Sequence, residues 1–216
     1  MTSTLSARAA LLDMDGTLVD STAVVEKLWL EWAQPHGLDP ATVLSTVHGR
    51  QGHQSMALLL PDRDHAVNLA ENQEMLRRES EDVDGVLAIA GAEALLRALT
   101  PFRHAIVTSA DVRLMTARMK AAGLAVPPII VTAESVTRSK PDPEGFLRGA
   151  AELGVEPADC IVFEDSAAGI RAGLDAGMTV IGVGAHAAGF SPTHHVDDLT
   201  SVHVSAASDG FELRLG

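Results

Sequence analysis

The sequence predicts an α/β fold, in which a doubly wound parallel sheet carries a small helical bundle inserted after its first strand. Two observations support this prediction. One short apolar run lies near the start of the chain, and further runs, rich in Val and Ile, alternate with helical segments through its second half. Such runs are the pattern of strands covered on both faces. Between the first run and the second, residues 20–87 show only helical patterns.

The elements of the sheet follow in a regular order. The expected strands are Ala9–Asp13, His104–Ser109, Pro128–Thr132, Cys160–Asp165 and Met178–Gly184. The helices expected between the later strands are Asp111–Ala122, Pro143–Leu153 and Ser166–Ala176. This alternation is typical of a Rossmann-like core with parallel strands. The final stretch, Ser201–Gly216, is predicted to form a short edge hairpin.

The insert is predicted to be a separate helical bundle. The segment "STAVVEKLWLEWAQ" begins at Ser21, a residue type common at helix N-termini, and has apolar residues at positions 24, 25, 28, 29 and 32. The segment "HAVNLAENQEMLRRES" has a similar helical pattern. We therefore expect residues 1–19 and 88–216 to form the core, and residues 20–87 to form a helical cap domain over one edge of the sheet.

Composition excludes several classes of protein. The chain of 216 residues is 46% hydrophobic with a mean hydropathy of +0.15, as expected of a globular protein. Its 29 acidic and 16 basic residues give a net charge of -13 without a basic cluster, which argues against nucleic acid as a partner. No apolar run approaches the roughly 20 residues needed to cross a bilayer, so we expect no membrane association.

The location is expected to be the cytoplasm. The N-terminal stretch has no charged segment followed by an apolar leader, so no signal peptide is expected. The single cysteine, Cys160, has no second cysteine with which to form an internal disulfide, and this fits a reducing compartment.

Polar residues stand where the predicted strands end. Because ligands of open α/β sheets bind beyond the carboxyl ends of the strands, we expect these side chains to meet at one edge. Each alone has a structural explanation, such as capping a helix, but their convergence does not. The residues are Asp13, Asp15, Thr108, Ser109, Lys140, Glu164 and Asp165.

The chemistry of this set points to a metal and a phosphoryl group. Several carboxylates cannot all stay ionised within a few ångströms of one another unless a cation compensates them. Oxygen ligands of this kind suit Mg²⁺. Zinc is not indicated, because the histidines lack metal-ligand spacing and Cys160 is alone. Ser109 offers a hydroxyl donor and Lys140 a positive charge, both suited to a phosphoryl group.

Four motifs carry a resemblance to a known family. In order and spacing, "DMDGTLVDS", "VTSA", "SKPDPEGF" and "FEDSAAGIRAGLDAGM" resemble the motifs of the haloacid dehalogenase-like hydrolase superfamily, and the helical insert resembles its cap. Within that superfamily, "HGRQ" (His48–Gln51) and "VTAESVTRSKPDPEGFL" resemble small sugar- and polyol-phosphate phosphatases. These are of the 2-deoxyglucose-6-phosphate, glycerol-phosphate and hexitol-phosphate phosphatase type.

The resemblance implies a role for each matching residue. Asp13 would attack phosphorus and form an aspartyl-phosphate, while Asp15 would act as general acid and base. The side chains of Asp13 and Asp165 and the backbone carbonyl of Asp15 would bind Mg²⁺, and Glu164 would reach the metal directly or through water. The expected activity is therefore Mg²⁺-dependent hydrolysis of a phosphate monoester.

The remaining expected contacts concern phosphate and substrate. Ser109 and the N–H of Ala110 would hold a phosphoryl oxygen, and Lys140 would neutralise charge on the nucleophile and on the transferred group. In the cap, His48 and Arg50 are candidate substrate contacts, although an exposed arginine is equally expected there. The partner would be a small phosphorylated metabolite, and the chain would act as a monomer.

Three alternative functions agree less well with the sequence. Dehalogenases of the superfamily generally lack the second aspartate, which is present here as Asp15. A phosphosugar mutase of the β-phosphoglucomutase type typically has a histidine in the first cap helix, and residues 21–27 contain none. A phosphate-binding module without activity would be marked by loss of Asp13, Asp15, Lys140 or Asp165, and all four are present.

Overall fold

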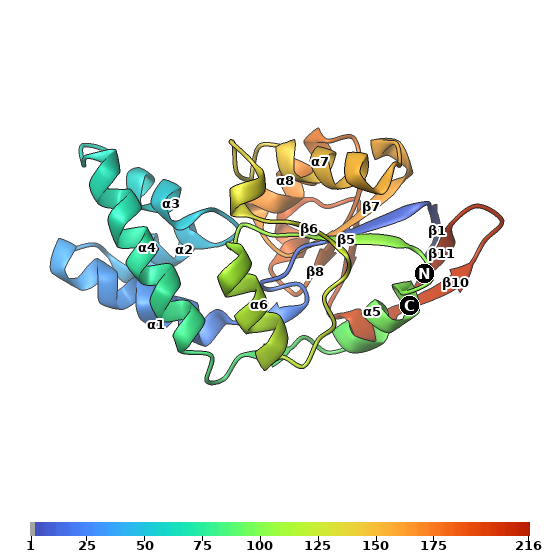
Figure 1. The fold of residues 1–216 in the computed structure, drawn as a ribbon, viewed down its shortest axis with the longest axis horizontal. Coiled ribbons are helices and arrows are strands. Elements are labelled where there is room, and N and C mark those ends of the chain that lie inside the picture. The colour runs from blue at the N-terminus through green and yellow to red at the C-terminus, as the bar shows by residue number, and fades with distance from the viewer. Residues whose placement is uncertain (1–2) are drawn as a thin grey trace.

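The computed structural model describes residues 3–216, and its centre is a six-stranded parallel sheet (Figure 1). In spatial order the strands are β6 (Ile129–Val131), β5 (Arg103–Val107), β2 (Ala9–Leu12), β7 (Cys160–Glu164), β8 (Thr179–Val183) and β9 (His194–Val196). All neighbouring pairs run parallel. The predicted Rossmann-like α/β fold is confirmed, and β9 is a strand that the sequence analysis did not predict.

Helices cover both faces of this sheet. On one face lie α5 (Ala92–Leu99) and α6 (Val112–Ala121), and on the other lie α7 (Glu144–Leu153) and α8 (Ala167–Asp175). Successive residues of a strand point to opposite faces, so Leu11 packs in the cluster with α7 and Leu12 in the cluster with α5 and α6. Because both residues are fully buried, the strand has no polar side. This explains its continuous apolar sequence.

A second, antiparallel sheet closes the core at the end remote from the helical insert (Figure 1). It contains β1 (Ser3–Ala7), β11 (Phe211–Leu215) and β10 (Val202–Ala206) in that order. The predicted C-terminal hairpin is present as β10 and β11. Strand β1, which pairs Ser3 with Leu215, was not predicted.

The helical insert forms its own apolar cluster. It consists of α1 (Thr22–Ala33), α2 (Pro40–Val47), α3 (Gly52–Leu59) and α4 (His65–Glu81). Helices α1 and α4 match the two predicted segments, whereas the bounds of α2 and α3 were not predicted. Trp29, Val43 and Met56 are buried at its centre. Two short antiparallel strands, β3 (Val19–Asp20) and β4 (Leu87–Ala88), carry the chain out of the core and back into it. The four helices lie together beside the sheet (Figure 1).

Short 3₁₀ turns complete the described chain, and they occupy Gln34–His36, Ala133–Ser135, Pro157–Asp159, Ala187–Phe190 and Leu199–Ser201. Within residues 3–216, we find no helix with both the length and the apolar character that a bilayer crossing requires.

Candidate active site

Lys140 is the centre of a buried ion cluster at the carboxyl ends of the parallel strands. Its Nζ donates to Asp13 Oδ1 at 2.5 Å, to Glu164 Oε1 at 2.7 Å and to the carbonyl of Val107 at 3.1 Å. Asp13 follows β2, Glu164 ends β7 and Val107 ends β5. Three neighbouring strands therefore hold one ammonium group, and the predicted convergence of Asp13, Lys140 and Glu164 is present in the structure.

Glu164 is fixed at both of its oxygens. While Oε1 accepts from Lys140, Oε2 accepts from the N–H of Ser166 at 2.7 Å and from its hydroxyl at 3.0 Å. The backbone of α8 comes so close that a Cβ on Gly169 would collide with this carboxylate. Glu164 thus orients the ammonium group of Lys140. The contact between Glu164 and a metal ion stays a prediction.

The acidic residues form a cluster suited to a hard cation. Asp13, Glu164 and Asp165 each place one carboxylate oxygen within 4.8 Å of the others. Burial raises the pKa of Asp13 to about 8, an effect that Lys140 opposes and the charges of Glu164 and Asp15 reinforce. Desolvation and the charges of Glu164 and Asp13 also raise the pKa of Asp165. A divalent cation would remove this repulsion, so the donor set fits Mg²⁺.

A glycine allows the two sides of this cluster to approach. Gly16 has a φ of 80°, which disfavours residues with a side chain, and a Cβ there would collide with the Asp165 carboxylate. The loop carrying Asp13 and Asp15 can therefore lie directly against Asp165.

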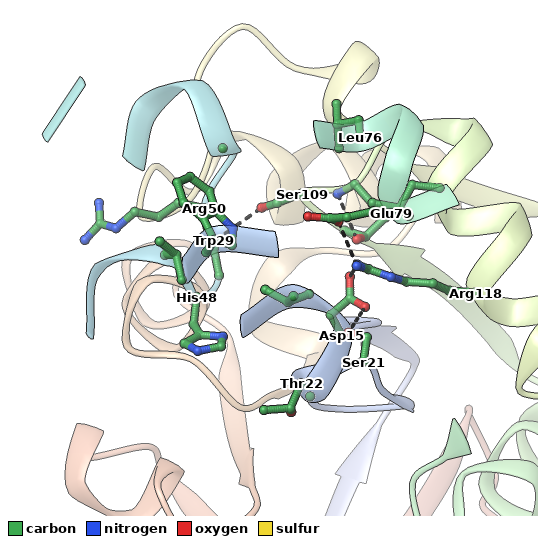
Figure 2. Close-up of a pocket in the computed structure, with 18 of the residues that line it drawn as sticks. Asp15, Ser21, Thr22, Trp29, His48, Arg50, Leu76, Glu79, Ser109 and Arg118 are labelled. Atoms are coloured by element: carbon green, nitrogen blue, oxygen red, sulfur yellow. Dashed lines mark hydrogen bonds and ion pairs between the residues drawn. The ribbon is translucent and has the colours of Figure 1, made fainter. Parts of the chain in front are cut away.

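Asp15 lies on the same loop but has different partners. Its Oδ2 forms an ion pair with Arg118 Nη1 at 2.8 Å, and its Oδ1 accepts from the Ser21 hydroxyl at 2.7 Å (Figure 2). Ser21 stands at the start of α1, where its side chain was expected to cap the helix, but it makes no capping hydrogen bond. Asp20 accepts the Thr22 N–H instead, at 3.1 Å.

The predicted phosphate-binding residues lie beside the acidic cluster. The Ser109 hydroxyl donates to the carbonyl of Gly49, on the loop between α2 and α3, at 3.3 Å. The N–H of Ala110 donates to the Thr108 hydroxyl at 3.1 Å. A bound phosphoryl group would have to replace or share these two hydrogen bonds.

A cavity joins this edge of the sheet to the helical insert (Figure 2). From the core it is lined by Asp13, Asp15, Gly16, Thr108, Ser109, Ala110, Leu114, Arg118 and Asp165. From the insert it is lined by Ser21, Thr22, Val25, Trp29, Val47, His48, Gly49, Arg50, Gly52, Asn72, Met75, Leu76 and Glu79. His48 and Arg50 thus border the cavity as expected, but the guanidinium of Arg50 lies away from Asp15 and Ser109 (Figure 2).

Comparison with known proteins gives the family. A family model described as haloacid dehalogenase-like hydrolase matches residues 7–177. The chain belongs to this family. The match spans the loop of Asp13 and Asp15, the helical insert, Lys140 and the start of α8, so it includes every residue of the site described above.

Relatives of this hydrolase include named phosphatases. Hexitol phosphatase A of Escherichia coli is 44% identical, over 82% of this chain and 83% of the relative. The 2-deoxyglucose-6-phosphate phosphatase 2 of Saccharomyces cerevisiae is 30% identical, over 80% of this chain and 78% of the relative. Among solved structures, a β-phosphoglucomutase from Clostridium difficile superposes with a TM-score of 0.79 at 22% identity, covering 89% of this chain and 92% of that one. The last similarity supports the fold alone.

Two buried charged residues of this hydrolase were missed by the sequence analysis. Arg118 lies on the buried stripe of α6 with Leu114 and Met115, and Glu79 lies on the buried stripe of α4 with Met75. For Arg118 the apolar stripe of α6 is a readable signal, because a charged residue at such a position is rarely buried without a partner. The identity of that partner could not be read from the sequence.

Proposed function

We propose that this hydrolase is a phosphatase that uses Mg²⁺ to hydrolyse a small sugar or polyol phosphate through an aspartyl-phosphate on Asp13. The observation that carries the proposal is the position of the Asp13 carboxylate. It contacts Lys140 Nζ, lies beside Glu164 and Asp165, and borders the cavity. The similarity to a hexitol phosphatase supports the substrate class.

We assign the catalytic core to residues 1–19 and 88–216, of which residues 1 and 2 lie outside the described part of the chain, and the cap to residues 20–87. The short β3–β4 pair at the two crossings supports this division. Because the cavity is lined from both parts, a substrate would enter when they separate and would be shielded from bulk water when they close.

In the first step, the Asp13 carboxylate attacks phosphorus while the ester P–O bond breaks. Asp15, as a carboxylic acid, gives its proton to the departing alkoxide oxygen, so that a neutral alcohol leaves. Lys140 neutralises negative charge near Asp13 and the transferred group. The Ser109 hydroxyl turns from the Gly49 carbonyl to a phosphoryl oxygen.

In the second step, Asp15 is a carboxylate and takes a proton from water as the water oxygen attacks phosphorus. The bond between Asp13 and phosphorus breaks, and inorganic phosphate leaves. Both aspartates return to their starting protonation states, so the net reaction is hydrolysis of a phosphate monoester.

The proposed Mg²⁺ ligands are the side chains of Asp13 and Asp165 and the backbone carbonyl of Asp15. When bound, the ion supplies positive charge that allows a phosphate dianion to share the site with the carboxylates. Because Glu164 already holds Lys140 and Ser166, its contribution to the metal site would add to this positioning role.

His48 and Arg50 are the proposed cap contacts to the sugar or polyol part, since both border the cavity. We also propose a monomeric enzyme, which is the common state in the family that the chain resembles, and a location in the cytoplasm, on the grounds given by the sequence. The buried position of Cys160 in β7 fits this location.

The direct test is a phosphate-release assay with hexitol, hexose and glycerol phosphates and an activated aryl phosphate. We expect turnover with Mg²⁺, none with excess chelator, and a loss of at least about 10⁴-fold in Asp13→Asn. A folded wild-type enzyme with no activity on the panel would contradict the proposal. Isomerisation of β-glucose-1-phosphate, assayed in parallel, would favour the mutase alternative instead.

A further inference from the structure

Arg118 joins the core, the cap and the acid–base residue in one buried ion cluster (Figure 2). The side chain is 3% exposed. Its Nη1 lies 2.8 Å from Asp15 Oδ2, and its Nη2 lies 2.7 Å from Glu79 Oε2. Arg118 belongs to α6 of the core, whereas Glu79 belongs to α4 of the helical insert.

Asp15 is held at both oxygens by this arrangement. Arg118 binds Oδ2 and the Ser21 hydroxyl binds Oδ1, so neither carboxylate oxygen can turn without losing a contact. A proton donor contributes to the rate only when it lies within hydrogen-bonding reach of the leaving oxygen. The orientation of the Asp15 carboxylate is therefore set by Arg118 and Ser21, which themselves need touch no substrate atom.

Glu79 makes this orientation dependent on the position of α4. A guanidinium presents its donors in a rigid planar fork, so fixing Nη2 on Glu79 also fixes the direction of Nη1 toward Asp15. If α4 moves away from α6, Arg118 loses one of its two carboxylates and with it half of this constraint. Glu79 is buried, and it pairs with Arg118 in the described structure, where α4 lies against α6.

We propose that Arg118 is a positioning residue that orients the Asp15 carboxylate for proton transfer, and that Glu79 locks Arg118 in place only when the cap lies against α6. Proton transfer is thereby coupled to cap closure through one arginine. The inference rests on the proposed function, because it needs Asp15 to act as the acid that protonates the leaving group.

The experiment compares two substrates in each variant. A hexitol phosphate needs a proton on its leaving oxygen, whereas an activated aryl phosphate does not. In Arg118→Ala we expect kcat to fall about 100-fold for the hexitol phosphate and less than about threefold for the aryl phosphate. Equal losses on both substrates would overturn the proposal, because they would indicate a general defect of fold or phosphate binding.

Two further variants separate positioning from simple attachment of the cap. Arg118→Lys keeps the charge but lacks the planar fork, so it should recover only part of the hexitol phosphate turnover. The exchange Arg118→Glu with Glu79→Arg keeps the ion pair between α4 and α6 but places a carboxylate beside Asp15. We expect the exchange to remain as slow as Arg118→Ala, and recovery to the wild-type rate would contradict the proposal.

The chain offers a matched control on the same two helices. Arg113 of α6 pairs with Glu81 of α4 at 3.1 Å, but both side chains are exposed and Arg113 does not contact Asp15. Arg113→Ala should change kcat for either substrate by less than about twofold. A selective loss on hexitol phosphate in this variant would show that any contact between the helices suffices, and would overturn the role of Arg118.

The two proposals fail in different ways. If wild-type enzyme and Asp13→Asn have the same activity on the aryl phosphate, the proposed function is wrong. If only Asp13→Asn is inactive and Arg118→Ala keeps the wild-type ratio of hexitol to aryl phosphate turnover, the function stands and the inference about Arg118 is wrong.

Discussion

Two buried cations contact the loop that carries Asp13 and Asp15, and each cation contacts two carboxylates. Lys140 contacts Asp13 and Glu164, and Arg118 contacts Asp15 and Glu79. The partners of Lys140 come only from the core sheet, whereas Arg118 has one partner from the core and one from the cap helix α4. The ion pairs of the proposed nucleophile thus involve the core alone, while those of the proposed acid are linked to the helical insert through Arg118 and Glu79.

This difference separates binding of the phosphate group from proton donation to the leaving group. An open enzyme would already present Asp13 and Lys140 to a phosphate group, because neither depends on the insert. Proton donation to the leaving group would wait for closure, when water is excluded. A substrate too large for closure would then be bound but turned over slowly.

The largest effect after loss of the nucleophile is expected at Lys140. Lys140→Ala removes the positive charge that contacts Asp13, and would face the transferred group, and leaves Glu164 buried without its cation. We expect kcat to fall about 10³-fold, and equally for hexitol and aryl phosphates, because charge on phosphorus develops in both reactions. Steady-state kinetics with the two substrates provides the measurement. A fall in kcat for the hexitol phosphate alone would mean that the Lys140 cluster and the Arg118 cluster do not have different roles.

Asp15→Ala should give the opposite pattern. Without the acid, kcat for the hexitol phosphate should fall about 100-fold or more, while formation of the aspartyl-phosphate from the aryl phosphate should be nearly unaffected. Burst kinetics with the aryl phosphate measure that first step separately from attack by water. An equal slowing of the first step for both substrates would count against Asp15 as the leaving-group acid.

The free energy of unfolding should depend on the buried carboxylates that pair with Lys140 and Arg118. Glu164→Gln and Glu79→Gln each remove one partner of a buried cation and should lower the free energy of unfolding by about 3 kcal/mol. Glu81→Gln, on the exposed face of α4, should cost less than about 1 kcal/mol. Urea unfolding of the three variants measures the difference. A cost at Glu79 as small as that at Glu81 would mean that the Arg118 cluster is not closed in solution.

The smallest effect is expected at the other end of β7, where burial serves no chemistry. Burial, with a contribution from Asp159, raises the pKa of the Cys160 thiol to about 11. Because the reactive form is the thiolate, which is scarce below that pH, the native protein at pH 8 should react with a thiol reagent roughly 100-fold more slowly than the unfolded chain. Equal rates would show that this end of the strand opens readily.

Much of the core could be predicted because its signals are local. The strands that carry Asp13, Ser109 and Glu164 are continuous apolar runs, and parallel strands bring their carboxyl ends to one edge. Once the strands were assigned, the cluster around Lys140 followed from the topology. The helical insert was readable for the same reason, since its apolar stripes recur within single segments.

Contacts between distant segments were not predictable in this way. Strand β1 pairs with β11 at the far end of the chain, and nothing local in residues 3–7 specifies that partner. Ser21 has the residue type of a helix cap, yet its hydroxyl serves Asp15. Arg118 interrupts the apolar stripe of α6, and Glu79 shares the buried face of α4 with Asn68, Asn72 and Met75, but the pairing of Arg118 with Glu79 depends on how α4 docks on α6.

If Asp13 is the nucleophile, it must be phosphorylated during turnover. The most direct measurement is acid quench within one turnover, followed by mass spectrometry of the peptide that contains Asp13. We expect one added phosphoryl group on Asp13 in the wild-type enzyme with Mg²⁺, and none in Asp13→Asn. Its build-up should be faster than phosphate release with the aryl phosphate. Turnover with no phosphorylated Asp13 at any quench time, or with the phosphoryl group on another residue, would contradict the account.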